Sequence, residues 1–460
     1  MVFSSILFLF FFLPTLGLCC FLLPERFRRG RNLILLAFSL LFYACAGLRA
    51  VPILLCSILC DYVVGRALEG SRHPKLWLGA GAALHLGLLF WFKYAVFTLT
   101  NLNRLGLDLP APTVVLPIGI SFFTFQGMSY LMDVYRRDVP AERSLTGLAL
   151  YISLFPQLIA GPIVRYKDVA AEISVRHETV DEAAQGLSRF LAGLGKKVLL
   201  SNAMAQIADA AFAGSPSAAL AWLGAAAYAF HIYFDFSGYS DMAIGLGRVF
   251  GFHFPENFDY PYLSKSITQF WRRWHISLSG WFRDYLYIPL GGSRLGTGRT
   301  VFNLFVVWAA TGLWHGANWT FLVWGVYFLI LLLGEKYLWK SALARLPGLF
   351  QHLYALLFIL LGWVWFRAGS LSHAISYFQA MLGLGGRWME PQVIYLLRQF
   401  WPELLIAPLA CAPVLPAVKR RMGDGAAATL TYRLAALAVG GLSVCRLLSS
   451  GFNPFIYFRF

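Results

Sequence analysis

The chain has 460 residues, of which 58% are hydrophobic and only 13% are charged. A soluble globular protein usually carries about 25% charged residues, so the composition argues against a soluble enzyme. The formal net charge of +16 would suggest nucleic acid in a soluble protein. Here the basic residues lie in short segments between apolar runs, as at 25–31 and 419–421. That is the positive-inside pattern of membrane proteins, and we expect no nucleic-acid partner.

Apolar stretches of membrane-spanning length recur along the whole chain. Each helical span needs roughly 20 apolar residues, and only helices or closed barrels satisfy the backbone in lipid. The stretches are continuously apolar, which favours helices over the alternating strands of a barrel. We therefore expect an all-α, polytopic helical bundle with about eleven to thirteen transmembrane helices. The expected spans are 3–23, 32–48, 50–65, 77–99, 113–133, 186–212, 219–249, 301–314, 319–335, 350–367, 394–416 and 430–448.

Two segments differ from simple spans. Residues 145–163 are apolar but are interrupted by Pro156, Gly161 and Pro162, and basic residues flank both ends. This pattern predicts a re-entrant segment that enters and leaves on the cytoplasmic side. Residues 165–185 form the most polar stretch and are predicted to be a cytoplasmic loop.

The chain shows no internal repeat and no appended soluble domain. We predict a single membrane domain over 1–460, with N-terminal spans 1–143, a central core 144–367 and C-terminal spans 368–460. The first apolar run has no basic residue before it, so it is expected to be a retained span rather than a signal peptide.

Residues 265–285 carry an amphipathic pattern. The polar side repeats at steps of three and four, which predicts one helix at an interface or along a polar cavity. Its members are Thr268, Arg272, His275, Ser279 and Arg283. Arginines on such a face, with the neighbouring Arg273, suit an anionic donor such as a phosphate-bearing thioester. The alternative is a basic face turned to lipid headgroups.

His315 lies between two apolar stretches whose outer ends, Arg299 and Lys336, are both basic. The two stretches therefore predict a helical hairpin with His315 at its turn or at a break within the bilayer. An ionisable group at membrane depth marks a functional site by default, and neutral imidazole is a good general base near pH 7. The alternative is a structural histidine bonded to a neighbouring helix.

The motif around His315 carries further candidates. Glycines at 312 and 316 permit close approach of the backbone, and Trp314 and Trp319 can wall a cavity. Asn318 adds a polar side chain to the same motif and is another candidate lining residue.

A third cluster contains His231, Asp235 and Asp241. His231 and Asp235 are one helical turn apart, so they can touch, and carboxylates at this depth need partners. Lysines at 196–197 or an arginine of the amphipathic segment could provide them. The alternative is a structural network that braces a break at Gly238.

Five long strings resemble the membrane-bound O-acyltransferase family, in its bacterial branch that includes alginate O-acetylation proteins and teichoic acid D-alanylation proteins. The strings are 117–136, 155–166, 233–245, 269–292 and 311–325. The ending at 452–458 also looks like that of the alginate-type members. The resemblance implies helices and re-entrant segments around a central tunnel. It implies that His315 is the catalytic histidine and that His275 is a second functional histidine.

The resemblance also implies partners and a location. An acyl thioester, with acetyl-coenzyme A as the simplest donor, would supply an acetyl group for an exported polysaccharide. An extracytoplasmic SGNH-type acetyltransferase would complete the transfer, in the inner membrane of a Gram-negative cell. No bound cofactor or metal is expected. Two alternatives stay open: D-alanyl transfer from a carrier protein to teichoic acid, and a transporter with an intramembrane His/Asp path.

Overall fold

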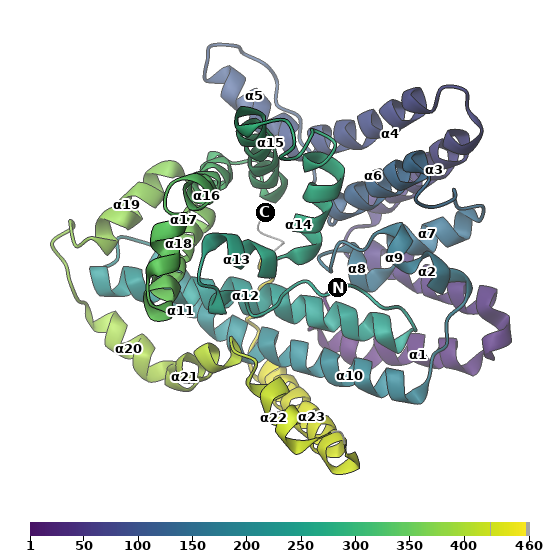
Figure 1. Ribbon diagram of the computed structural model, residues 1–460. Helices are drawn as coiled ribbons and strands as arrows, with labels where there is room; N and C mark the ends of the chain where they lie inside the picture. Colours follow the sequence, from purple (N-terminus) through teal and green to yellow (C-terminus); the bar gives the residue numbers. More distant parts are fainter. Residues whose placement is uncertain (424, 457–460) are drawn as a thin grey trace. The chain divides into compact units, whose positions relative to one another are not determined.

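The computed structural model describes residues 1–423 and 425–456. Every regular element in these residues is a helix (Figure 1), which confirms the all-α prediction. The chain forms two compact units, one of residues 1–190 with 239–255, and one of 191–238 with the chain from 256 onward. Two of the three divisions fall inside helices, α10 (Val180–Gly195) and α12 (Ala218–Val249), and the third follows Pro255 in an irregular segment. The subdivision expected at 143 and 367 stays a prediction.

The first unit, apart from its parts of α10 and α12, is a set of helices with short π- and 3-10 turns. These are η1 (Phe8–Phe12), α1 (Leu13–Leu22), η2 (Glu25–Phe27), α2 (Arg28–Ala44), η3 (Leu48–Ala50), α3 (Val51–Gly70), α4 (Pro74–Leu89), η4 (Phe90–Tyr94), α5 (Ala95–Asn103), α6 (Ile120–Arg136), α7 (Leu145–Ser153), α8 (Phe155–Leu158) and α9 (Tyr166–Ser174).

The second unit contains the remaining helices and the histidines of interest. These are η5 (Lys196–Ser201), α11 (Asn202–Phe212), η6 (Pro261–Leu263), α13 (Ile267–Arg273), α14 (Ile276–Phe282), η7 (Arg283–Tyr287), α15 (Thr297–His315), α16 (Trp319–Tyr337), α17 (Lys340–Arg345), α18 (Gly348–Arg367), α19 (Leu371–Met381), α20 (Pro391–Gln399), α21 (Trp401–Ala410), α22 (Val414–Met422) and α23 (Ala426–Ser449).

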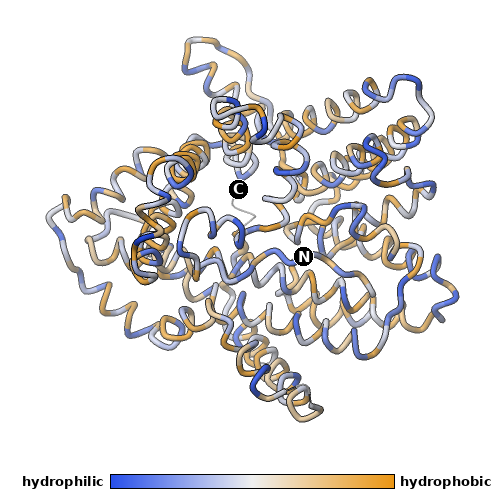
Figure 2. The backbone as a smooth tube through the Cα atoms, viewed as in Figure 1, coloured by the Kyte–Doolittle hydropathy of each residue, from blue (hydrophilic) through white to orange (hydrophobic). Residues whose placement is uncertain are grey.

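Five described helices are long and apolar enough to cross a membrane, and each contains a span expected from the sequence. They are Leu48–Gly70, Pro74–Asn103, Trp319–Tyr337, Gly348–Arg367 and Ala426–Ser449. Two bent pairs, Phe8–Leu22 with Glu25–Ala44 and Pro391–Gln399 with Trp401–Ala410, would raise the number to seven. Figure 2 shows hydrophobic residues along the helices, while the most hydrophilic ones lie largely in connections and at helix ends. By this measure, the expected count of eleven to thirteen is too high for the described residues.

Part of the difference arises because several apolar stretches are interrupted, although the expected spans 219–249 and 301–314 lie within the continuous helices α12 and α15. The span expected at 113–133 becomes helical only from Ile120, since Gly119 has a left-handed φ of 77°. Residues 145–163 divide into the short helices α7 and α8, so the expected interruption is present. The prediction of a loop at 165–185 is wrong, because α9 and the start of α10 occupy most of it.

In the first unit, α3, α4 and α6 pack around a buried contact between a histidine and an aspartate. His85 Nε2 lies 2.7 Å from Asp61 Oδ1, and both side chains are almost fully buried. A Cβ atom on Gly127 of α6 would lie 2.3 Å from Asp61 Oδ2. The lone histidine of the span at 77–99 is therefore a partnered structural histidine.

In the second unit, the helix expected over 265–285 is not continuous. It ends at Arg273 and begins again at Ile276, with His275 between them in the left-handed region. His275 is buried, whereas Arg272, Ser279 and Arg283 are exposed, so the predicted single polar stripe is wrong. The first turn of α13 is anchored by Glu335 of α16.

Glu335 is 5% exposed although it lies in a membrane-spanning helix. Its carboxylate accepts hydrogen bonds from the backbone N–H groups of Ile267 and Thr268, at 2.6 and 2.8 Å, and from the Thr268 hydroxyl at 2.6 Å. Ser266 caps the same turn through Gln269 N–H. The donors at the start of a helix have no partner within it, so Glu335 fixes where α13 begins.

We expect Glu335→Ala to lower the stability of the protein by about 1–3 kcal/mol, because it leaves buried N–H donors unpaired. Glu335→Gln retains one acceptor oxygen and should lose less. Thermal unfolding of the detergent-solubilised protein measures both variants. The exposed neighbour Lys336→Ala is the control, and an equal loss in Lys336→Ala and Glu335→Ala would contradict the anchoring role.

Candidate active site

His315 is the last residue of α15, and α16 begins four residues later. The two helices pack side by side (Figure 1). A Cβ atom on Gly312 would lie 2.4 Å from the Phe321 carbonyl oxygen, and one on Gly325 would lie 2.4 Å from the Trp308 carbonyl oxygen. Glycine at both positions is therefore a condition of this close approach. The predicted hairpin with His315 at a break is what the structure contains.

The His315 ring is surrounded by aromatic side chains but is not sealed. Its centroid lies 5.0 Å from those of Trp314 and Phe366 and 5.2 Å from that of Trp324, all with edge-to-face geometry. The residue is partly exposed. Aromatic walls lower the local dielectric and keep water away from the imidazole.

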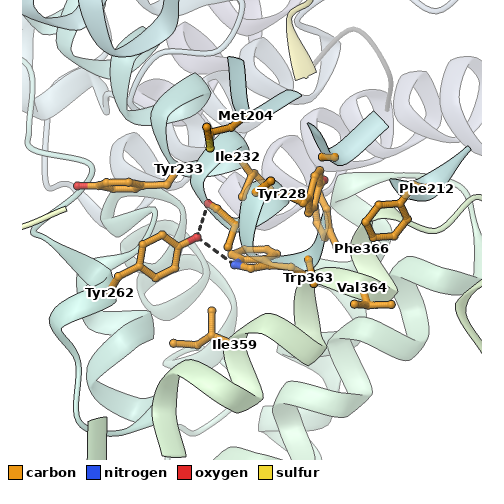
Figure 3. Close-up of a cluster of buried hydrophobic side chains, with 14 of the residues drawn as sticks. Met204, Phe212, Tyr228, Ile232, Tyr233, Tyr262, Ile359, Trp363, Val364 and Phe366 are labelled. Atoms are coloured by element: carbon orange, nitrogen blue, oxygen red, sulfur yellow. Dashed lines mark hydrogen bonds between the residues drawn. The ribbon is translucent and has the colours of Figure 1, made fainter. Parts of the chain in front are cut away.

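A small cavity lies against this ring, with a lining that is apolar apart from His315. Its residues are Ile232, Phe236, Trp274, His315, Trp324, Trp363, Phe366 and Ile456. Figure 3 shows Ile232, Trp363 and Phe366 within one buried cluster. There the Trp363 indole donates to the Tyr262 hydroxyl, which in turn donates to the Ala229 carbonyl oxygen. These bonds hold the α18 wall of the cavity against α12.

His275 lies at the break between α13 and α14 and is 1% exposed. Its ring centroid is 4.6 Å from that of Phe236, which lines the cavity, and 5.8 Å from that of Trp314. Because Trp314 contacts both imidazoles, the structure brings His275 and His315 to one place. Burial, and then the nearby His315, hold the pKa of His275 well below its ordinary value, which favours the neutral ring.

Asp235 of α12 is fully buried and holds the last described part of the chain. One of its carboxylate oxygens lies 2.5 Å from Lys197 Nζ, and the other accepts the Ile456 backbone N–H at 2.9 Å. Lys197 also donates to the Pro454 carbonyl oxygen. The pair therefore fixes Ile456 in the wall of the cavity. Tyr457 and Phe458, the rest of the predicted alginate-type ending, lie outside the described residues.

His231 and Asp235 are connected through Ser201. The Ser201 hydroxyl lies 3.0 Å from His231 Nδ1 and 3.2 Å from Asp235 Oδ1. The break expected at Gly238 is absent, because α12 continues to Val249. Gly238 instead permits close packing on Gly193, whose carbonyl oxygen would lie 2.8 Å from an added Cβ atom.

Four further predicted residues are exposed or have partners elsewhere in the second unit. Arg272 and Ser279 are exposed, and Arg273 lies 3.8 Å from Asp259. Asn318 caps α16 through the Thr320 N–H and donates to the Gly369 carbonyl oxygen.

Two predicted contacts differ in the structure. Trp319 is 44% exposed, so the expectation that it walls the cavity is wrong. Asp241 belongs to the first unit and pairs with Arg189 at 2.9 Å, rather than with the expected lysines or an arginine of the amphipathic segment. Sequence reasoning missed Asn257, whose side chain contacts His275 at 3.1 Å, and Ile456.

Comparison with known proteins gives consistent matches. Residues 141–366 match the model of the MBOAT, membrane-bound O-acyltransferase family. The probable alginate O-acetylase AlgI of Azotobacter vinelandii is 40% identical, with 100% of both chains covered. The peptidoglycan O-acetyltransferase of Helicobacter pylori is 36% identical over 84% of this chain and 80% of its own length. The teichoic acid D-alanyltransferase of Bacillus subtilis is 28% identical over 52% of this chain and 64% of its own length.

We expect Gly312→Ala to destabilise the protein by about 1–3 kcal/mol through overpacking and to displace His315 from the cavity. Gly298→Ala lies on the same helix with no heavy atom within 4 Å of the added Cβ, and is the matched control. Thermal unfolding measures both. A wild-type melting temperature for Gly312→Ala would show that the hairpin does not need the close approach.

Asp235→Ala leaves the buried Lys197 ammonium without its carboxylate, and should destabilise by about 3–5 kcal/mol. The half-exposed pair of Asp209 with Arg367 is the comparison, and Asp209→Ala should lose no more than about 1 kcal/mol. The double variant Asp235→Leu with Lys197→Met should recover part of the loss, since it removes both charges. Chemical or thermal unfolding in detergent distinguishes these outcomes.

Proposed function

The chain belongs to the membrane-bound O-acyltransferase family, and we propose that it transfers an acetyl group from a cytoplasmic thioester toward an exported polysaccharide. The protein is a multi-pass membrane acyltransferase, and its reaction requires an acyl donor. Acetyl-coenzyme A as donor, a polysaccharide as final acceptor and the inner membrane of a Gram-negative cell as location are parts of the proposal.

The proposal depends above all on the position of His315 at an apolar cavity from which its ring is not sealed. In the proposed step, the imidazole takes the proton of an acceptor hydroxyl. The oxygen then bonds to the thioester carbonyl carbon, the carbon–sulfur bond breaks, and the thiolate leaves and takes up the proton. Such base catalysis typically contributes about 100- to 10,000-fold. The apolar lining supports the step because it excludes water that would hydrolyse the thioester.

His275 supports the same chemistry from its buried position beside Trp314. Alignment of donor and acceptor between two fixed imidazoles supplies rate by orientation. Exposed Arg272 and half-buried Arg273, at the end of α13, suit the phosphates of coenzyme A. Trp314, Asn318, Ser279, His231 and Asp235 are retained as candidate donor-side or cavity residues, whereas Asp241 belongs to the first unit.

The proposed acceptor, a cell-surface glycan, is chosen by analogy with the relatives. The full-length match is to a probable alginate O-acetylase and a further match to a peptidoglycan O-acetyltransferase, which favours O-acetylation of a cell-surface glycan. An extracytoplasmic SGNH-type acetyltransferase is proposed as the partner that completes the transfer. D-alanyl transfer is the second candidate. It ranks below acetylation because the match to the D-alanyltransferase covers only about half of this chain. Because the chain belongs to an acyltransferase family, the transporter alternative is set aside.

We expect His315→Ala to reduce acetyl transfer from labelled acetyl-coenzyme A by about 100-fold or more, with normal folding and membrane insertion. The assay uses the full chain in proteoliposomes and measures loss of the thioester together with labelled product. His73→Ala, an exposed histidine of the first unit, should keep wild-type activity.

A parallel assay supplies D-alanyl carrier protein in place of acetyl-coenzyme A. If the protein prefers that donor, the reaction that it catalyses is D-alanyl transfer and the proposal of acetyl transfer is wrong. Full acetyl transfer by His315→Ala at normal protein level would remove His315 from the mechanism.

A further inference from the structure

The carbonyl oxygen of the Asn257 side chain is the centre of a small buried network. Asn257 is fully buried, and its Oδ1 atom lies 3.1 Å from His275 Nδ1, 3.3 Å from the Ser277 backbone nitrogen and 2.8 Å from the Ser277 hydroxyl. The Asn257 backbone carbonyl also accepts the Ile276 N–H at 3.0 Å. One residue therefore holds three successive residues around the break between α13 and α14.

The orientation of the Asn257 amide follows from one of these contacts. A backbone N–H can only donate a hydrogen bond, so the atom that faces Ser277 N–H must be the amide oxygen. The opposite orientation would set an NH₂ group against that N–H. With the oxygen fixed, His275 Nδ1 must carry the proton that it shares with Asn257, because an amide oxygen can only accept.

The other ring nitrogen of His275 has no hydrogen-bond partner among the described residues. A buried polar atom without a partner is rare in folded proteins and calls for an explanation. His275 is also one of three non-glycine residues in the described chain with positive φ, at 45°. Such a conformation persists only where the surrounding contacts enforce it, as the Asn257 network does here.

We propose that Asn257 is a positioning residue: its side-chain oxygen holds His275 as the Nδ1-protonated tautomer, so that Nε2 accepts a hydrogen bond or proton from the reacting groups. The inference depends on the proposed function for the identity of those groups. The tautomer itself does not depend on it. Ser277 completes the network, since its backbone N–H and its hydroxyl both contact the same oxygen.

The first experiment reads the tautomer in the full-length protein. Nitrogen-15 NMR of histidine-labelled protein distinguishes a protonated from an unprotonated ring nitrogen, and the His275 signals are identified by their loss in His275→Gln. The expected result is a protonated Nδ1 and an unprotonated Nε2. The reverse tautomer, or a doubly protonated ring at neutral pH, would overturn the proposal, whatever the activity of the protein.

The second experiment compares variants in the acetyl-coenzyme A assay. Asn257→Leu removes the acceptor oxygen, and should lower kcat about 100-fold with a mixed tautomer signal and little change in KM for acetyl-coenzyme A. Asn257→Asp keeps an acceptor oxygen at the same place, and should retain activity within about 10-fold of wild type. Ser277→Ala removes the hydroxyl contact alone and should resemble wild type.

The outcomes separate the two proposals. Equal inactivity of folded Asn257→Asp and Asn257→Leu, with an unchanged His275 tautomer, would overturn the positioning role. Absence of acetyl transfer by the wild-type protein would overturn the proposed function, and full activity of His275→Gln would overturn the part of His275 Nε2 in the reaction. In both cases the nitrogen spectrum still decides the tautomer. If Asn257→Leu fails to fold, the wild-type spectrum and Asn257→Asp still test the inference.

Discussion

A buried backbone N–H group without a partner costs about 1–3 kcal/mol, and irregular segments of the second unit contain buried N–H groups outside regular helical bonding. Three buried side chains meet this constraint. Asn257 accepts the Ser277 N–H, Glu335 accepts two N–H groups of α13, and Asp235 accepts the Ile456 N–H. The irregular segments beside the cavity exist because these acceptors are present, and the geometry of the site depends on them.

The two histidines occupy different environments for this reason. His315 terminates a regular helix, and its partial exposure follows from the glycine-permitted turn into α16. His275 lies inside an irregular segment, where Asn257 contacts its Nδ1 atom and Phe236 packs edge-to-face against its ring. An imidazole at a cavity suits direct proton transfer, while an imidazole in a fixed tautomer provides one defined acceptor atom. The two histidines thus differ in their proposed roles because His315 ends a regular helix and His275 lies in an irregular segment.

The cavity is assembled from segments that are distant in sequence. α12, the α13–α14 break, the α15–α16 hairpin, α18 and the last described residues each contribute to its lining. Its wall is held mainly by apolar packing, together with a few hydrogen bonds such as that from the Trp363 indole to the Tyr262 hydroxyl. The relatives share this family while their names give different acceptors.

Composition and local pattern were sufficient for the helical class, for five spans and for His315, because a continuous apolar run and an ionisable residue between glycines are local signals. The same patterns predicted one helix over 265–285, since helical periodicity ignores Asn257, which lies about twenty residues before the break and accepts hydrogen bonds across it. The pairing of Asp235 with Lys197 could be anticipated from charge, but not the capture of Ile456, more than two hundred residues away. Local periodicity and charge thus determined the helical class and the hairpin that carries His315. Only the tertiary structure decided where the helices break, because buried side-chain acceptors from other segments bind the backbone N–H groups at those breaks.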